Sequence, residues 1–174
     1  VLPLKVSEEF SEMFTVVIQL GAILAVLVLF FHKLNPFSPK KDEKQKAKTW
    51  NLWFKVVVAA LPSAVLGLLL DDWMDEHLYN HVVVAITLIG YGVAIMYIEN
   101  RNRGKAPRVK TVYGHSYRDA LLIGAFQCLA LIPGTSRSGS TILGAMMLGV
   151  GRSAGSEFSF FLAIPTMVGA SLLK

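Results

Sequence analysis

Apolar residues in this chain form long uninterrupted segments, separated by shorter segments that carry most of the charge. Residues 13–31 contain no ionisable side chain, and a helix needs about 20 apolar residues to cross a bilayer. Three later segments are of similar length and are also largely apolar. The pattern therefore predicts an all-α polytopic integral membrane protein with spans at roughly 13–31, 51–70, 81–98 and 156–173.

Residues 119–151 follow a different pattern, with a short apolar stretch on each side of the polar segment PGTSRSGST (133–141). As a helix, the first stretch is about 20 Å long, which is less than the ~30 Å hydrocarbon core, and the second (142–150) is shorter still. Irregular backbone at membrane depth is tolerated only where protein buries it or where it lines a wet cavity. We therefore predict a re-entrant or broken helix pair over 119–151, within a single transmembrane domain (1–174).

The composition and the placement of charge agree with a membrane protein. The chain is 53% hydrophobic and only 17% charged, whereas soluble domains are about 25% charged. Segments 32–50 and 99–118 each hold six Lys or Arg, and 71–80 holds none. The positive-inside rule places both basic segments in the cytoplasm and 71–80 outside, so that the polar segment opens outward. The net charge of +5 then reflects topology, and we expect no nucleic-acid partner.

Arg137 is the candidate for chemistry, because it is the only Lys or Arg between Arg118 and Arg152. An arginine at membrane depth costs about 2.5–3.5 kcal/mol unless it is paired, so such a residue indicates function. Glycines expose backbone N–H groups, hydroxyls donate hydrogen bonds, and a helix beginning at Thr141 would add a positive dipole end. Arginine can also hold a phosphate through two parallel bonds. We predict a phosphate site facing a membrane cavity, formed by Gly134, Thr135, Ser136, Arg137, Ser138, Gly139 and Thr141.

Two soluble or enzymatic alternatives fail on particular residues. Gly134 to Thr141 nearly matches the nucleotide-binding loop G-x-x-x-x-G-K-[ST], but Ser140 occupies the lysine position and no strand precedes the segment. A lipid phosphatase with a histidine nucleophile needs a histidine downstream of the Ser-Arg pair, and the last histidine is His115.

Cys128 lies in an apolar stretch and is the only cysteine, which excludes a disulfide framework within the chain.

Three ordered blocks resemble the undecaprenyl-diphosphate phosphatase family, also called bacitracin-resistance proteins. They are FTVVIQLGAILAV (14–26), FQCLALIPG (126–134) continuing into the polar segment, and SEFSFFLAIPTM (156–167). The resemblance covers essentially the whole chain. It implies a bacterial plasma-membrane enzyme with inverted repeats and an active site at the outer face. The implied reaction removes the terminal phosphate of a C55 isoprenoid diphosphate, so that the lipid carrier of cell-wall synthesis is recycled.

The resemblance also assigns roles within the polar segment. Ser136 and Arg137 match the essential pair of the family motif, and Thr141 matches its terminal hydroxyl. Arg137 would clamp the diphosphate, and Ser136 would donate a hydrogen bond to phosphate or act as the nucleophile. Gln19 and Glu157 match the outer blocks, and for both a structural hydrogen bond and direct contact with substrate remain open.

The chain departs from the family at its first motif. Glu8 and Glu12 satisfy E-x-x-x-E, but no Pro-x-Ser-Ser-x-Gly-His segment follows, so we interpret them as a solvated surface. The family implies a divalent metal, Mg²⁺ or Ca²⁺, and we assign no metal ligand in this chain. The segments 14–23 and 158–167 form a faint internal repeat, and we expect the chain to be the central portion of a longer protein. The chain has four histidines, and none of them lies in the family's catalytic context: His32, His77, His81 and His115.

The preferred function is therefore a membrane phosphatase acting on a polyprenyl diphosphate. A transporter or flippase for an anionic lipid or phosphate would use the same broken-helix loop and is the main alternative. A scaffold in which Arg137 only pairs with an acid such as Glu157 is the third. The expected partners are the lipid diphosphate and membrane lipids, and a homodimer is compatible with the sequence.

Overall fold

Helices form wherever the sequence offers an apolar run, and the breaks fall at residues that cap or interrupt a helix. The computed structural model describes residues 7–173, without the side chains of residues 8, 12, 71, 75, 170 and 173. Helix α1 begins after Ser7, whose hydroxyl accepts from the Phe10 N–H, and α4 begins after Asn80, which accepts from two N–H groups. The elements in chain order are α1 (Glu8–Leu29), α2 (Phe31–Leu34), α3 (Glu43–Leu78), α4 (His81–Asn102), the 3₁₀ turn η1 (Val112–Gly114), α5 (Tyr117–Cys128), the 3₁₀ turn η2 (Leu129–Leu131), α6 (Arg137–Met147) and α7 (Arg152–Leu173).

Three of these helices are long and apolar enough to cross a membrane, over Glu9–Leu29, Glu43–Leu70 and His81–Asn102. They expose many large apolar side chains, which lipid would cover, among them Leu24, Leu69 and Ile89. The predicted all-α polytopic membrane protein is thus confirmed. Helix α7, which contains the expected span 156–173, is not among the three, and its residues Phe158 and Phe161 are fully buried by protein.

The helix ends differ from the expected loops. We predicted loops at 32–50 and 71–80, but α3 extends through 36 residues from Glu43 to Leu78 and leaves only Tyr79 and Asn80 before α4. The prediction of loops rested on the polar composition of these segments. A helix that leaves the bilayer can continue into water, because its backbone hydrogen bonds are internal to it. The charged ends of α3 are such extensions. The side chains of Glu8 and Glu12, which we predicted to form a solvated surface, lie outside the described part of the chain.

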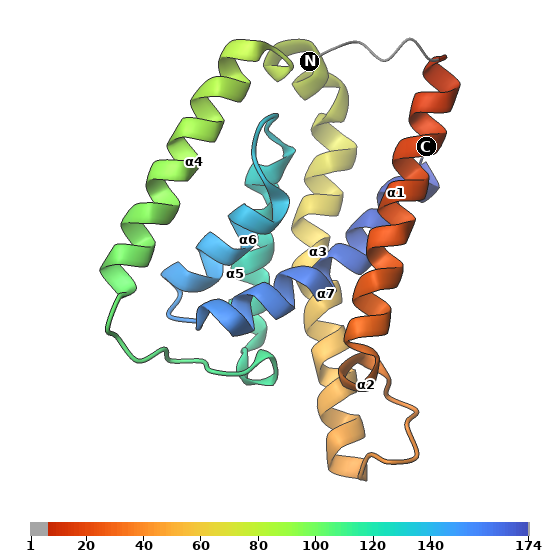
Figure 1. Cartoon of the computed structure of the whole chain (residues 1–174), viewed down its shortest axis with the longest axis vertical. Coiled ribbons are helices and arrows are strands. Elements are labelled where there is room, and N and C mark those ends of the chain that lie inside the picture. The colour runs from red at the N-terminus through yellow and green to blue at the C-terminus, as the bar shows by residue number, and fades with distance from the viewer. Residues whose placement is uncertain (1–6, 174) are drawn as a thin grey trace.

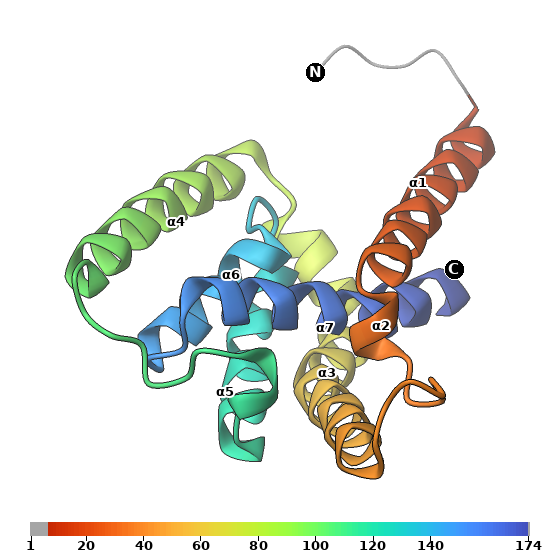
Figure 2. The ribbon, with the colours of Figure 1, turned by 60° about the horizontal axis from the view of Figure 1, so that its bottom comes forward.

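The region of the predicted re-entrant pair holds two short helices that pack against one another, α5 and α6. They have 12 and 11 residues, which corresponds to about 18 Å and 16 Å, so neither could span a bilayer alone. Figures 1 and 2 show α1 and α4 at opposite edges of the molecule, with α5, α6 and α7 between them. The short pair therefore packs between the longer helices, while Leu121 of α5 and Leu129 of η2 stay exposed.

The core lies where α3, α5 and α7 meet. Gly124 of α5 faces the backbone of Ala59 in α3, and a Cβ at Gly124 would come within 2.1 Å of the Ala59 carbonyl oxygen. One turn further along α5, the Gln127 amide donates to the Ser63 hydroxyl at 2.6 Å, in an environment that buries both side chains. Close backbone approach through a small residue, combined with a buried polar bond, is typical of helix packing in membranes.

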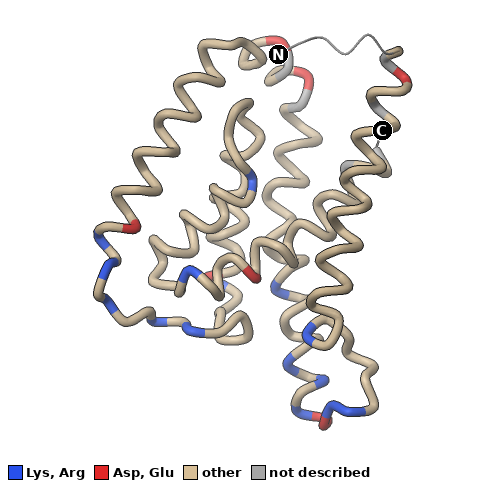
Figure 3. The backbone as a smooth tube through the Cα atoms, in the orientation of Figure 1, with Lys and Arg blue, Asp and Glu red and all other residues tan. Residues whose placement is uncertain are grey.

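Basic residues gather at one end of the molecule, as Figure 3 shows. This end contains the connection between α2 and α3 and the connection between α4 and α5. The opposite end carries acidic residues and no Lys or Arg in the part of the chain that is drawn in colour, and further acidic residues lie among the basic ones. The two basic segments thus share one side, as the positive-inside prediction requires.

The contact between Gly124 and Ala59 gives a testable prediction. Gly124→Ala should lower the unfolding temperature of the detergent-solubilised protein, because the added methyl must push α5 away from the α3 backbone; overpacking of this kind costs about 1–3 kcal/mol. Gly90→Ala is the matched control, since a Cβ at Gly90 of α4 meets nothing within 4 Å. Equal unfolding temperatures for the two variants would contradict the proposed packing.

Candidate active site

Helix α6 begins at Arg137, with Ser136 as its N-cap. The Ser136 hydroxyl accepts from the Gly139 N–H at 3.1 Å, and the Ser136 carbonyl accepts from the Ser140 N–H. The sequence placed the helix start at Thr141, which is wrong by four residues, because Ser136 is a good capping residue and no proline follows it. The correction places Arg137 in the first turn, at the positive end of the helix dipole.

The loop before α6 is held against α4. Gly134 has φ +86°, and a Cβ there would meet the Thr87 hydroxyl at 2.5 Å and the Val84 Cα at 2.8 Å. The Thr87 hydroxyl donates to the Pro133 carbonyl at 2.9 Å. Gly134 is thus required both by its left-handed backbone and by the close approach of α4. This role is structural, and contact with phosphate remains a prediction for Gly134.

Arg137 is half-buried and reaches from α6 to α7. Its Nη1 donates to the Thr166 hydroxyl at 3.0 Å, and Thr166 in turn donates toward the Leu162 and Ala163 carbonyls. Among the described residues no carboxylate forms an ion pair with Arg137. The guanidinium therefore keeps its charge and most of its donors for another partner.

A cavity of about 220 Å³ borders Arg137 and Ser138, between α1, α6 and α7. Ile23 and Val26 of α1 and Phe160 and Ile164 of α7 form its apolar walls, and Ser159 adds a hydroxyl. A cation and two hydroxyls in an apolar cavity at the break of a helix pair suit an anionic head group attached to an apolar chain.

Thr141 is buried inside the protein and does not reach the surface of the site. It is 1% exposed, and its hydroxyl lies 2.6 Å from the Ser159 hydroxyl and 3.0–3.1 Å from the Arg137 and Ser138 carbonyls. The Ser159 contact joins α6 to α7, and together with the two contacts inside α6 it uses the hydrogen-bonding capacity of the hydroxyl. The geometry favours Thr141 as a positioning residue over a direct substrate contact.

The remaining loop residues surround the start of α6. Ser136 and Ser138 are exposed, and their hydroxyls lie 3.2 Å apart. The Thr135 hydroxyl is buried and has no hydrogen-bond partner within the described residues. Gly139 packs closely against Ser136, the N-cap of α6, since a Cβ added at Gly139 would lie 3.1 Å from the Ser136 Cβ. The structure thus brings the predicted residues of the polar segment together at one helix terminus.

The two outlying candidates behave differently. Gln19 of α1 lies one turn before Ile23, which lines the cavity, so Gln19 is on the same face of α1. Glu157 instead accepts from the Lys33 ammonium with both carboxylate oxygens, each at 2.8 Å. It is nine residues before Thr166 on α7, about 13 Å along the helix. The structure therefore does not bring Glu157 to Arg137, so Glu157 is not the acid that the scaffold alternative requires.

Sequence reasoning did not single out Thr166 and Ser159, which contact the predicted site from α7. A signal was available, since the two hydroxyls are seven residues apart in an apolar run and so share one helix face. What the sequence did not give is the partner, because nothing in the spacing indicates that this face meets the start of α6.

Metal-ligating side chains do not cluster here. Within the described part of the chain, no group of three or more His, Cys, Asp or Glu is arranged to hold a metal ion. His115 is buried, stacks on Phe158 with ring centroids 4.8 Å apart, and shares a hydrogen bond with the Val112 carbonyl. Burial lowers the pKa of His115, because it disfavours the charged ring. His115 therefore belongs to the packing at the basic end.

These features define a class: a polytopic α-helical membrane protein with a candidate anion site at the break of a short helix pair. Comparison with known proteins makes the class specific. The family model described as bacitracin resistance protein BacA matches residues 1–174. The chain belongs to this family.

Relatives in the family are close in sequence. The chain is 58% identical over 173 residues, or 99% of its length, to a protein of Enterococcus faecalis named undecaprenyl-diphosphatase, of which it covers 63%. It is 60% identical over 168 residues, or 97% of its length, to a Lactiplantibacillus plantarum protein of the same name, of which it covers 61%. The chain thus spans about three fifths of the length of these curated relatives.

Proposed function

We propose that the protein carrying this chain is a membrane phosphatase that hydrolyses undecaprenyl or a similar polyprenyl diphosphate to the monophosphate. The observation that carries the proposal is Arg137, half-buried at the N-terminus of α6, facing an apolar cavity, and bound to a hydroxyl instead of an acid. The names of the relatives support it, since they are called undecaprenyl-diphosphatase.

The site residues would act by holding and neutralising the diphosphate. Arg137 has five N–H donors, and one nitrogen contacts Thr166, so the remaining donors are available to phosphate oxygens. The N-terminus of α6 adds a positive dipole end beside them. Phosphoryl transfer is accelerated mainly by positioning and by stabilising charge on the equatorial oxygens, which is what this arrangement supplies.

Ser136 and Ser138 would complete the contacts. Their hydroxyls are exposed next to Arg137 and can donate to phosphate. Ser136 also caps α6, so its oxygen already accepts a backbone hydrogen bond. A capping oxygen engaged in this way is better suited to positioning the helix and donating to phosphate than to acting as a nucleophile.

The lipid would reach the site through the apolar walls of the cavity. The isoprenoid chain matches Ile23, Val26 and Ile164, and the diphosphate matches Arg137 at the polar end. Because the basic end is expected to face the cytoplasm, the site would open toward the outer face of a bacterial plasma membrane. Homodimerisation is a further proposal and is not needed for this geometry.

A divalent metal, Mg²⁺ or Ca²⁺, is proposed from the family resemblance. The described residues do not offer a ligand set for it, and Glu157 is engaged with Lys33. Its ligands would have to come from outside these residues.

The central prediction concerns Arg137. In the intact protein, Arg137→Ala should reduce phosphate release from a polyprenyl diphosphate by a factor of 10³ or more, the size expected for an arginine that stabilises phosphoryl-transfer charge. Arg118→Ala is the matched control, because Arg118 is an exposed cation of α5 that does not line the cavity. Turnover by Arg137→Ala close to that of the control would refute the proposed function, provided that both insert normally into membranes.

A second prediction isolates the positioning of Arg137. Thr166→Val keeps the side-chain shape and removes the hydroxyl that holds the guanidinium, so kcat should fall by roughly ten- to a hundred-fold with little change in unfolding temperature. Thr166→Ser retains the hydroxyl and should restore most of the activity. If Thr166→Ser is as impaired as Thr166→Val, the hydrogen bond is not the cause.

A third prediction separates hydrolysis from transport. Chelation of divalent metal should abolish phosphate release by the intact protein, and Mg²⁺ or Ca²⁺ should restore it. Binding of the polyprenyl diphosphate without release of phosphate, with or without metal, would favour the transporter alternative. The measurement is inorganic phosphate released by purified protein in detergent.

A further inference from the structure

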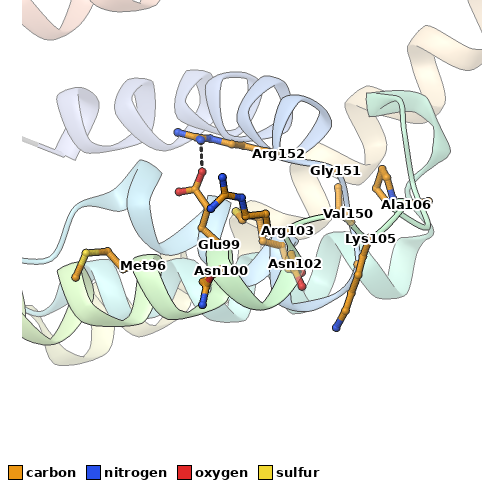
Figure 4. Close-up of a pocket in the computed structure, with 13 residues that line it drawn as sticks. Met96, Glu99, Asn100, Asn102, Arg103, Lys105, Ala106, Val150, Gly151 and Arg152 are labelled. Atoms are coloured by element: carbon orange, nitrogen blue, oxygen red, sulfur yellow. Dashed lines mark hydrogen bonds and ion pairs between the residues drawn. The ribbon is translucent and has the colours of Figure 1, made fainter.

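A second cavity, of about 710 Å³, lies at the opposite end of α6 from Arg137. Figure 4 shows it where the end of α4, the segment that follows α4 and the first turn of α7 come together. It shares no lining residue with the Arg137 cavity. It lies at the basic end of the molecule shown in Figure 3, which the positive-inside rule assigns to the cytoplasmic membrane surface.

The floor of this cavity is fixed by bonds that occupy the C-terminal carbonyls of α6. The Asn102 amide donates to the Met146 carbonyl at 3.0 Å, and the Arg108 guanidinium donates to the Leu148 carbonyl at 3.1–3.2 Å. The Arg108 and Val109 N–H groups both donate to the Gly149 carbonyl. The negative end of the α6 dipole is therefore matched by donors and does not oppose an anion in the cavity.

The charged side chains at the rim give the cavity a positive balance. Arg103, Lys105 and Arg152 stand against the single acid Glu99, so the formal charge of the lining is 3 − 1 = +2. Glu99 accepts from Arg152 at 2.6 Å, and Figure 4 shows this pair joining α4 to α7, with Arg103 beside Glu99 and the Lys105 amine extending away from the pair. Over residues 7–173, neither Arg103 nor Lys105 forms an ion pair.

The remaining walls are apolar and adjoin a membrane-spanning helix. Met96 of α4, Met146 of α6 and Pro107 line the cavity, and α4 is one of the helices able to cross the bilayer. A free phosphate ion would use the cations and leave these walls in water. A phospholipid would use both, because its phosphate lies at the depth of the basic residues and its glycerol and first methylenes lie deeper.

We propose that this cavity binds the phosphate headgroup of an anionic phospholipid from the cytoplasmic leaflet, with Arg103 and Lys105 as the phosphate contacts. The bound lipid would rest on Met96 and Met146 and bridge α4 to the first turn of α7. This site is independent of the phosphatase proposal, and its test does not depend on hydrolysis.

The experiment measures the unfolding temperature of the intact protein in a neutral detergent while dioleoyl-phosphatidylglycerol is added. We expect a saturable rise, with no comparable rise for dioleoyl-phosphatidylcholine. In the double variant Arg103→Gln/Lys105→Gln, half-saturation should require roughly ten-fold more phosphatidylglycerol, because two cations that contact the headgroup are gone. The charge-conserving variant Arg103→Lys/Lys105→Arg should bind like the unchanged protein.

The matched control is Lys44→Gln/Lys48→Gln, which removes two exposed cations from the basic start of α3, outside the cavity. Its half-saturation should not move. An equal weakening in the control, or none in Arg103→Gln/Lys105→Gln, would overturn the proposal. So would an equal thermal rise with millimolar inorganic phosphate, which would make the cavity a site for the free ion. If the double variant does not fold, Arg103→Gln and Lys105→Gln singly must each raise the half-saturating concentration while the control does not.

Discussion

Backbone groups and charged side chains at membrane depth need hydrogen-bond partners, and the rest of this structure depends on that requirement. The chain interrupts a helix pair at residues 129–136 and places an arginine at the break, and lipid can stabilise neither. Protein must therefore enclose the break. Thr87 of α4 donates to the loop carbonyl of Pro133, and Thr166 of α7 accepts from Arg137. Helix α3 packs against α5. Each of these contacts exists because an interruption in the membrane has to be shielded.

The enclosure explains why small and hydroxyl residues are found where they are. Gly124 lets the α3 backbone approach α5, and Gly134 lets α4 approach the loop, so a side chain at either position would open the enclosure. The hydroxyls of Thr87, Thr141 and Ser159 then bridge the helices that have been brought together. The candidate anion site results from this arrangement, because the same close packing leaves Arg137 sheltered and, among the described residues, bound to a hydroxyl and to no carboxylate.

The two ends of α6 are used in opposite ways. Its N-terminus carries Arg137 and has its positive dipole end available to an anion. At its other end, Asn102 donates to the Met146 carbonyl and Arg108 donates to the Leu148 carbonyl just beyond the helix, and these donors offset the negative dipole end beside the basic cavity. A helix of 11 residues thus joins two cavities suited to phosphate, one expected at each side of the membrane. We propose the first for the lipid diphosphate and the second for a structural phospholipid.

The sequence by itself determined the helical membrane class, the broken segment and the polar loop with its arginine. Uninterrupted apolar length, half-length runs and an isolated charge are all local properties of the chain. It misplaced the ends of α3 and the start of α6, because polar residues can continue a helix in water and because Ser136 could cap as well as contact phosphate. Only the tertiary structure decided which side chains meet. Arg137 met Thr166, and Glu157 met Lys33 124 residues away, because helix packing angles bring together positions that no sequence spacing relates.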